Sequence, residues 1–343
     1  MPRQPHRAAL VDSRIGGGHT SAMEEQRRVG SYRLGRPLPT VTHHSRVVLA
    51  NHEDDEEGVP PRFVAKITDV TGKGAKGRVA RCEHEARLLR AFNHPGIPSG
   101  HADGVERGAC YLIMDYVQGV DLATLLGHHT DEPRGLAREV AVYILAQLAD
   151  ALYYAHGAEV ADDAGNAQSL DVLHRDICPA NVLVSSEGDV LLGDFGSSIS
   201  SWLQPQFAGK QAGHVAYMAP ERVTGTGEVS QRSDLFSVAV ILWEMLQGRR
   251  CFRAEDDLKT VDAISLFDIS HASRRVTGLS PKLSEILRKN LDRDPSRRYT
   301  GAYQMLQRLA QAPEAGKAEQ SRLALADMVQ AATRTPPGAT AGG

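Results

Sequence analysis

The sequence predicts an α+β fold with two lobes: a small antiparallel-sheet lobe carrying one main helix, and a larger, mainly helical lobe. Two observations predict it. Short runs rich in β-branched and aromatic residues cluster in the first third of the chain, whereas longer stretches with apolar residues at helical spacing fill most of the rest. Strands grouped ahead of helices are typical of α+β proteins.

Four stretches of the chain have the pattern of strands. Residues 32–38, 46–50 and 62–67 are strand-like, and the acidic turn 53–58 between the last two favours antiparallel pairing of these three. A further apolar strand is expected over 111–117. Together they predict the sheet of the small lobe.

Two helices stand out in the same way. Residues 79–92 predict a helix, because Ala86, Leu89 and Phe92 recur at helical spacing and the Asn-His-Pro-Gly run that follows does not readily continue one. A long amphipathic helix is expected over 136–155, and the pattern beyond it is mostly helical. The larger lobe therefore follows the small one.

The same pattern divides the chain into domains. A flexible tail is expected over 1–29, which is rich in Arg, Gln, Gly and Pro and lacks sustained apolar periodicity. The expected parts of the main domain, 30–312, are a small lobe over about 30–115, a hinge over about 115–119 and a larger lobe over about 120–312. Residues 313–343 are expected to form a C-terminal segment and a disordered end, and the amphipathic part of that segment either docks a partner or, more commonly, packs on its own domain.

Composition limits the kinds of protein that this chain can be. It has 343 residues, 41% of them hydrophobic, and 39 basic against 42 acidic residues, so no overall field favours nucleic acid or a membrane surface as a partner. The longest wholly apolar run, 238–243, is far short of a membrane span, and the start lacks the apolar core of a signal peptide, so a cytoplasmic location is expected. The four scattered cysteines fit reduced thiols.

The most informative run is 173–181, Leu-His-Arg-Asp-Ile-Cys-Pro-Ala-Asn, which is followed by Asp194-Phe195-Gly196. With its neighbours it resembles the eukaryotic-like Ser/Thr protein kinases of bacteria over residues 31–312, about the whole predicted domain. The other motifs that carry the resemblance, in the family's order, are Phe63-Val64-Ala65-Lys66, Glu85, Met218-Ala219-Pro220-Glu221, Asp234, and Arg298 after Asp294-Pro295.

The resemblance implies a role for each reactive side chain, with ATP and Mg²⁺ as cofactors. Asp176 would be the catalytic base that accepts or orients the proton of the substrate hydroxyl, and Asn181 and Asp194 would hold magnesium through hard oxygen ligands. Lys66 would contact the α- and β-phosphates, and Glu85 would hold Lys66 in place.

A nucleotide pocket is implied in the same way. Met114 would be the gatekeeper, and backbone groups of Asp115 and Val117 would bind the adenine. Asp121 has two readings that remain open, a ribose contact or the N-cap of a helix. The side chains expected to line the adenine pocket are Val47, Ala65 and Leu183, and strand alternation turns Val64 and Lys66 to one face.

Two further residues favour a protein as the substrate. In the family, Glu221 and Arg298 form a buried ion pair that anchors the activation segment, which a small-molecule kinase does not need. Asp234 resembles the aspartate that braces the catalytic loop. A small-molecule phosphotransferase, which shares the His-x-Asp-x4-Asn core, is therefore disfavoured.

The chain also departs from the family pattern. Residues 39–47, where the glycine loop should lie, start at Pro39 and contain no glycine, so a weaker grip on ATP is expected. Cys178 replaces a lysine and His214 replaces a threonine in one local network. Cys178 is read as an inert small residue, with a redox-sensitive thiol as the alternative.

The activation segment lacks the usual switch. Residues 204–213 contain no Ser or Thr, although serines occur earlier, from Ser197 to Ser201. Arg175 would ordinarily pair with a phosphate there, so activation by phosphorylation is expected to be absent or moved to the early serines.

The sequence thus favours an ATP-dependent serine/threonine protein kinase that transfers the γ-phosphate of ATP to a hydroxyl of a protein substrate, with no nucleic-acid or membrane partner. The alternative is a pseudokinase, a nucleotide-binding or interaction module with weak or no turnover.

Overall fold

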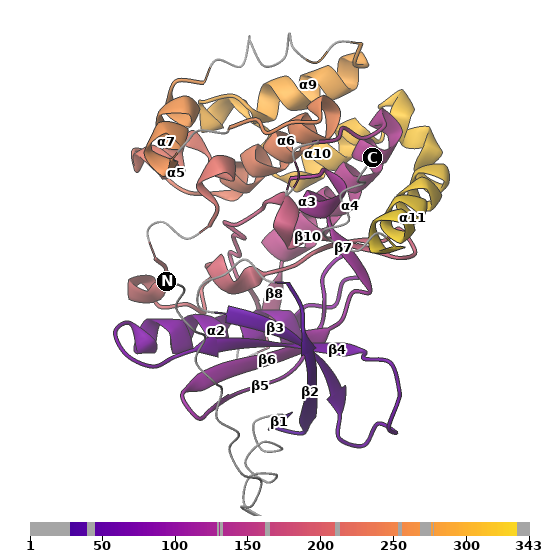
Figure 1. Cartoon of the computed structure of the whole chain (residues 1–343). Coiled ribbons are helices and arrows are strands. Elements are labelled where there is room, and N and C mark those ends of the chain that lie inside the picture. Colours follow the sequence, from indigo (N-terminus) through magenta and orange to yellow (C-terminus); the bar gives the residue numbers. More distant parts are fainter. Residues whose placement is uncertain are drawn as a thin grey trace, which may run out of the picture.

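The computed structural model describes residues 28–39, 45–128, 130, 133–161, 165–209, 213–252, 256–267, 276 and 278–334. Residues 1–27 of the expected flexible tail, residues 40–44 of the glycine-free loop and residues 335–343 of the expected disordered end lie outside the described residues. The last two residues assigned to the tail, Arg28 and Val29, form a short strand. Figure 1 shows a sheet-rich lobe joined to a larger helical lobe, so the predicted α+β, two-lobed fold is confirmed.

The small lobe is built on a six-stranded sheet in the order β1-β2-β3-β4-β6-β5, with every neighbouring pair antiparallel. Its strands are β1 (Arg28–Val29), β2 (Tyr32–Pro37), β3 (Ser45–His52), β4 (Phe63–Asp69), β5 (Gly100–Glu106) and β6 (Ala109–Asp115). The sequence analysis missed β5, because its two glycines and single β-branched residue give it little strand propensity. Pairing along the whole of β6 supplies the stabilisation that its own sequence lacks.

One long helix, α2 (Ala75–Ala91), packs against β4, β5 and β6. It begins four residues before the predicted start. Its N-cap is Gly74, whose φ of 81° lies in the left-handed region that glycine adopts without strain. Its inward face buries Glu85, Leu88 and Leu89. Because that face also lies over the junction of the lobes, α2 brings a carboxylate to the place where the two lobes meet.

The larger lobe is mainly helical. Its helices are α3 (Leu122–Leu125), α4 (Arg138–His156), α5 (Pro220–Thr224), α6 (Gln231–Gln247), α7 (Asp257–Ser265), α9 (Pro281–Asn290), α10 (Ala302–Leu309) and α11 (Ala318–Arg334). Helix α6 starts at a capping box between Ser230 and Ser233 and is buried along most of its length, so it forms the centre of the lobe. Helices α4 and α9 pack against α6, and α10 packs against both α4 and α9.

Two small sheets complete the larger lobe. The first pairs β11 (Val190–Leu192), β10 (Val182–Ser185) and β7 (Gly119–Asp121), and the second pairs β8 (Glu159–Ala161) with β9 (Ala167–Ser169). The β10–β11 hairpin directly follows the predicted catalytic loop and directly precedes Asp194. It therefore fixes the distance between the two ends of the predicted site.

The C-terminal helix α11 packs on its own lobe. It contacts α4, α3, β7 and β10, and its Leu325 and Val329 are fully buried in the main apolar cluster. Arg322 Nη1 donates to Glu187 O at 2.6 Å, and Figure 1 shows α11 running along the outer side of the lobe. Of the two readings left open for this amphipathic segment, self-packing is the one that the structure supports.

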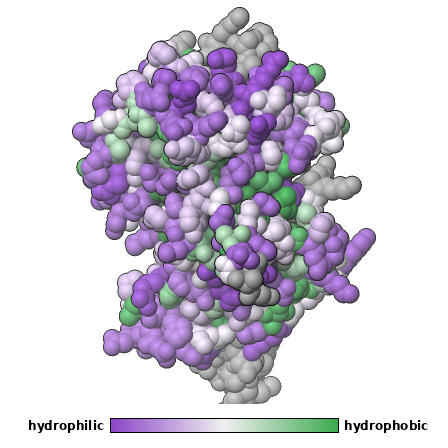
Figure 2. Space-filling view, turned by 180° about the vertical axis from the view of Figure 1, so that it is seen from behind, coloured by the Kyte–Doolittle hydropathy of each residue, from purple (hydrophilic) through white to green (hydrophobic). Residues whose placement is uncertain are grey.

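The surface seen in Figure 2 is mainly hydrophilic. Seen from behind, Figure 2 shows a mainly hydrophilic face on which hydrophobic residues gather most clearly near the junction of the lobes. None of the helices in the described part of the chain combines the length and the apolar character that a membrane span requires.

Candidate active site

A cavity of about 280 Å³ lies between the two lobes. Residues from both lobes line it: Leu38, Pro39, Ser45, Val47, Val64, Lys66, Glu85, Pro98, Met114, Asp115, Tyr116, Val117, Asp121, Asp176, Ala180, Asn181, Leu183, Gly193, Asp194 and His214. Most of the side chains to which the sequence assigns a site role are thus within one cavity.

Lys66 joins the two lobes by ion pairs. Its Nζ lies 2.8 Å from Glu85 Oε1 on α2 and 2.6 Å from Asp194 Oδ1, which follows β11. Burial opposes the charge of Lys66, but the carboxylates of Asp194 and Glu85 outweigh it and hold the Lys66 pKa above its usual range. Burial likewise opposes the charge of Asp194, yet Lys66 holds the pKa of that carboxyl at about 2. The cavity therefore contains a fixed cation beside a fixed anion.

Phe195 orients Asp194 toward the cavity. The Phe195 ring is fully buried and packs edge-on against Phe92, with the ring centroids 5.3 Å apart, and against His174 at 4.6 Å. Asp194 itself has a φ of 58°, a left-handed conformation that non-glycine residues rarely adopt. The buried ring and this backbone conformation together point the carboxylate at Lys66.

Asp234 holds the backbone of the catalytic loop from below. Its two carboxylate oxygens accept hydrogen bonds from the backbone N–H groups of His174 and Arg175, both at 2.9 Å, and it also lies 2.9 Å from His156 Nε2. Arg175 has a φ of 69°, so the loop turns sharply immediately before Asp176. The bracing that the resemblance implied for Asp234 is present in these contacts.

The Asp176 carboxylate is held by His214. Asp176 Oδ1 lies 2.9 Å from both the backbone N and the Nδ1 atom of His214. Gly213 allows this approach, because a Cβ there would meet Arg175 O at 2.6 Å. The hydrogen bond with Asp176 raises the pKa of His214 to about 11. A histidine thus replaces the family's threonine and contacts the same carboxylate.

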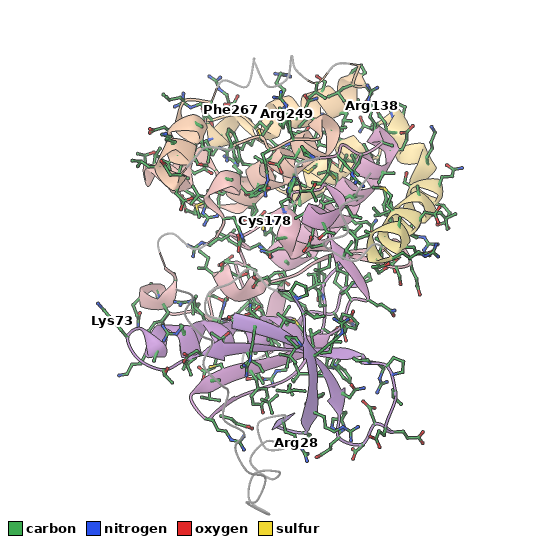
Figure 3. All side chains as sticks on the ribbon, viewed as in Figure 1. Arg28, Lys73, Arg138, Cys178, Arg249 and Phe267 are labelled. Carbon is green, nitrogen blue, oxygen red and sulfur yellow. The ribbon has the colours of Figure 1, made fainter. Side chains whose placement is uncertain are left out.

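Cys178 contacts the same ring nitrogen of His214. Its Sγ is 3.4 Å from His214 Nδ1, and the residue is almost fully buried. Burial raises the pKa of the Cys178 thiol above its usual value, which opposes a reactive thiolate. Figure 3 shows Cys178 near the middle of the molecule, where the larger lobe faces the smaller one.

Asn181 and Asp194 suit a hard metal ion. Asn181 Nδ2 donates to Asp176 O at 2.7 Å, which turns the amide so that its oxygen is the group left for a ligand. Both residues line the cavity, and both offer oxygen donors, the kind that Mg²⁺ prefers. The donor set is therefore compatible with magnesium.

Strand alternation corrects one predicted pocket residue. Ala65 was predicted to line the adenine pocket, and this prediction is wrong. Ala65 is fully buried on the other face of β4, in a cluster that includes Tyr32 and Ile113, whereas Val64 and Lys66 face the cavity. Successive side chains of a strand point to opposite faces, so alternation alone could have identified Val64 as the lining residue.

The other residues predicted for the pocket come from both lobes and the hinge. Val47, Met114, Val117 and Leu183 all line the cavity.

The two hinge-side acids have defined partners. Asp115 Oδ2 accepts from Ser99 N at 2.9 Å, so this side chain is tied to the start of β5. Asp121 Oδ1 accepts from Thr124 N at 2.7 Å, which makes Asp121 the N-cap of α3. Because Asp121 also lines the cavity, the ribose contact stays a prediction beside the cap.

A buried ion pair anchors the segment beyond the site. Arg298 Nη1 and Nη2 bind Glu221 Oε1 and Oε2 at 2.8 and 2.9 Å, and both side chains are almost completely buried. Ser233 Oγ donates to Glu221 Oε1 at 2.7 Å. This bidentate pair ties α5 to the loop that follows α9.

The side chain of Arg175 binds backbone carbonyl groups of the activation segment. The guanidinium donates to Ala208 O and Gly209 O, both at 2.6 Å, in the stretch that carries no Ser or Thr. Ser198 is buried, and Ser200 Oγ lies 2.8 Å from His84 Nε2 on α2. The guanidinium of Arg175 is thus bound to two backbone carbonyl oxygens, where in the family it would bind a phosphate.

Comparison with known proteins gives one consistent family. The protein kinase domain family matches residues 43–310. The chain is 33% identical to tyrosine-protein kinase MasK of Myxococcus xanthus over 219 residues. The matched region covers 64% of this chain and 33% of that protein. It is 27% identical over 316 residues to serine/threonine-protein kinase PknL of Mycobacterium tuberculosis, covering 88% and 66%.

A eukaryotic relative extends the comparison. Ribosomal protein S6 kinase alpha-3 of Homo sapiens is 33% identical over 288 residues, which cover 75% of this chain and 35% of that protein. The chain therefore spans about a third of the length of MasK and of this S6 kinase.

Proposed function

Because this chain belongs to the protein kinase family, we propose that it transfers the γ-phosphate of ATP to serine and threonine hydroxyls of a protein substrate. The observation that carries the proposal is the set of contacts in the interlobe cavity. Lys66 is paired with both Glu85 and Asp194, while Asp176 lines the same cavity. A charged cluster of this kind in a cleft is costly to bury and is typical of an active site.

The proposed roles follow from these contacts. Lys66, held by Glu85, binds the phosphates of ATP. The side chains of Val47, Met114 and Leu183, which line the cavity, enclose the adenine. Asp176 accepts or orients the proton of the attacking hydroxyl. Asn181 and Asp194 hold magnesium, which when bound supplies positive charge against the phosphate oxygens.

A protein is favoured as the substrate by the buried Glu221–Arg298 pair. The pair fixes α5, which follows the activation segment, and so keeps a surface beside Asp176 in one position. For the acceptor hydroxyl, the relatives give different names: PknL is named a serine/threonine-protein kinase, whereas MasK is named a tyrosine-protein kinase. The acceptor is therefore the first property to measure.

Phosphoamino-acid analysis tests the proposal. The full chain is incubated with γ-labelled ATP, Mg²⁺ and a generic protein substrate such as casein, and the labelled protein is hydrolysed. We expect phosphoserine and phosphothreonine. Phosphotyrosine alone would overturn the acceptor assignment. Label no higher than that of an Asp176→Asn variant, together with thermal stabilisation by ATP and Mg²⁺, would favour the pseudokinase.

His214 is proposed to be a positioning residue for Asp176. Its backbone and side chain both bind Asp176 Oδ1, so it restricts the rotation of the carboxylate. His214→Ala is expected to lower kcat by about 10- to 100-fold, with the KM for ATP nearly unchanged. His214→Thr, which restores the family's hydroxyl, should recover part of the loss.

The readout that separates positioning from folding is the division between kcat and KM. A fall in melting temperature that accompanies equal losses in both variants would indicate a structural role instead. A rise in the KM for ATP without a fall in kcat would place His214 in nucleotide binding.

A further inference from the structure

The two departures from the family pattern meet at one point in the structure. Cys178 replaces a lysine and His214 replaces a threonine, 36 positions apart in the chain, yet Cys178 Sγ lies 3.4 Å from His214 Nδ1. The same nitrogen lies 2.9 Å from Asp176 Oδ1. The two replacements therefore bring a thiol and an imidazole together, and both groups are common ligands of transition metals.

These three ligand atoms are already close to one another. Sγ of Cys178, a ring nitrogen of His214 and a carboxylate oxygen of Asp176 all lie within 4.8 Å of one another, and no other group of three such side chains does so among the residues that the structure describes. Zinc binds thiolate at about 2.3 Å and imidazole or carboxylate at about 2.0 to 2.2 Å. In a tetrahedral site, ligand atoms at those distances are roughly 3.3 to 3.6 Å apart. The 3.4 Å between Sγ and Nδ1 falls in this range, the 2.9 Å between Nδ1 and Asp176 Oδ1 is shorter, and the third pair lies within 4.8 Å.

We propose that Asp176, Cys178 and His214 form a binding site for a zinc ion at the base of the active-site cavity. The ion lies between Sγ, Nδ1 and a carboxylate oxygen, and water takes the fourth position. Cys178 and His214 each release one proton when the ion binds. The exposed edge of the His214 ring and the cavity in front of Asp176 give the ion a way in.

The site differs in its chemistry from the proposed magnesium site. Asn181 and Asp194 offer only oxygen donors, which suit Mg²⁺, whereas a sulfur, nitrogen and oxygen set favours zinc. The two sites therefore select different ions from the same cavity. Binding of zinc does not depend on the proposed kinase activity.

The consequence for turnover does rest on the proposed function. An ion bound to Asp176 would occupy the carboxylate that accepts the substrate proton, so zinc would inhibit phosphate transfer. Removal of zinc by a chelator would restore it. This would give the chain a form of control that needs no hydroxyl in residues 204–213.

Direct binding tests the site in the absence of ATP and substrate. The full chain, freed of metal with a chelator, is titrated with Zn²⁺ against a chromophoric chelator. We expect one bound ion per chain, with affinity reduced at least about 100-fold in Cys178→Ser and in His214→Ala. Cys251→Ser, which changes a half-buried cysteine that is not one of the three proposed ligands, is the matched control and should bind zinc like the unaltered chain.

Cobalt gives a second readout that needs no folded variant. Co²⁺ bound in place of zinc should show thiolate-to-metal charge-transfer absorption and the intense visible bands of tetrahedral coordination. Absence of these bands, lack of stoichiometric binding, or equal affinity in Cys178→Ser would each overturn the site. If zinc binds but activity is absent in every form, the proposed function fails and the metal site stands.

Discussion

Asp176→Asn is expected to lower the rate of phosphate transfer by about 10³-fold, in the middle of the range for loss of a general base. Asparagine has nearly the shape of aspartate, and its amide oxygen can still accept from the backbone N–H of His214, as Asp176 Oδ1 does at 2.9 Å. What is lost is the negative charge that receives the hydroxyl proton. The measurement is initial-rate transfer from labelled ATP to a protein substrate.

Binding of ATP should persist in that variant. Lys66, Glu85 and Asp194 are untouched, so thermal stabilisation by ATP and Mg²⁺ is expected to match that of the unaltered chain. Asp257→Asn, at an exposed position in the first turn of α7, is the matched control and should keep full activity. Retention of more than about a tenth of the rate by Asp176→Asn would exclude Asp176 as the base.

Arg298→Met is expected to destabilise the fold by about 3 to 5 kcal/mol. The substitution leaves the Glu221 carboxylate buried with Ser233 Oγ as its remaining side-chain partner, whereas in the intact chain both oxygens bind the guanidinium. A buried and uncompensated charge is among the largest single costs in a folded protein. The free energy of unfolding is measured by urea titration.

Two further variants make this test specific. Glu221→Leu combined with Arg298→Met removes both charges and should recover part of the lost free energy, because no unpaired charge then remains. Arg297→Met changes the adjacent arginine, whose ion pair with Asp294 is exposed, and should leave the unfolding midpoint unchanged. Equal effects of Arg297→Met and Arg298→Met would show that burial of the pair is not the cause.

Many of the site residues could be proposed from the sequence because phosphate transfer demands particular groups at particular spacings. The five-residue spacing from Asp176 to Asn181 and the position of Lys66 in a strand can both be recognised in the sequence alone. Local propensity likewise predicted β2, β3, β4 and β6 and the helices α2 and α4, with ends displaced by at most four residues.

Other features depended on contacts between distant segments. Strand β5 forms against β6 despite weak propensity, and α11 is held by contacts of its apolar face with α4. The error at Ala65 is of another kind, because strand alternation counted from Lys66 already puts Ala65 on the opposite face. Propensity describes a residue and its neighbours in the chain, whereas the formation of β5 and the packing of α11 depend on the segments that lie against them.

The sequence by itself determined the fold class and the types of reactive group, because hydrophobic periodicity and motif spacing are properties of the chain. Only the tertiary structure decided which of these groups meet. Lys66 reaches Asp194 across 128 positions, and Cys178 reaches His214 across 36. Such contacts are set by the packing of Phe195, α2 and the β10–β11 hairpin, since burial in a shared core fixes distances that no local preference contains.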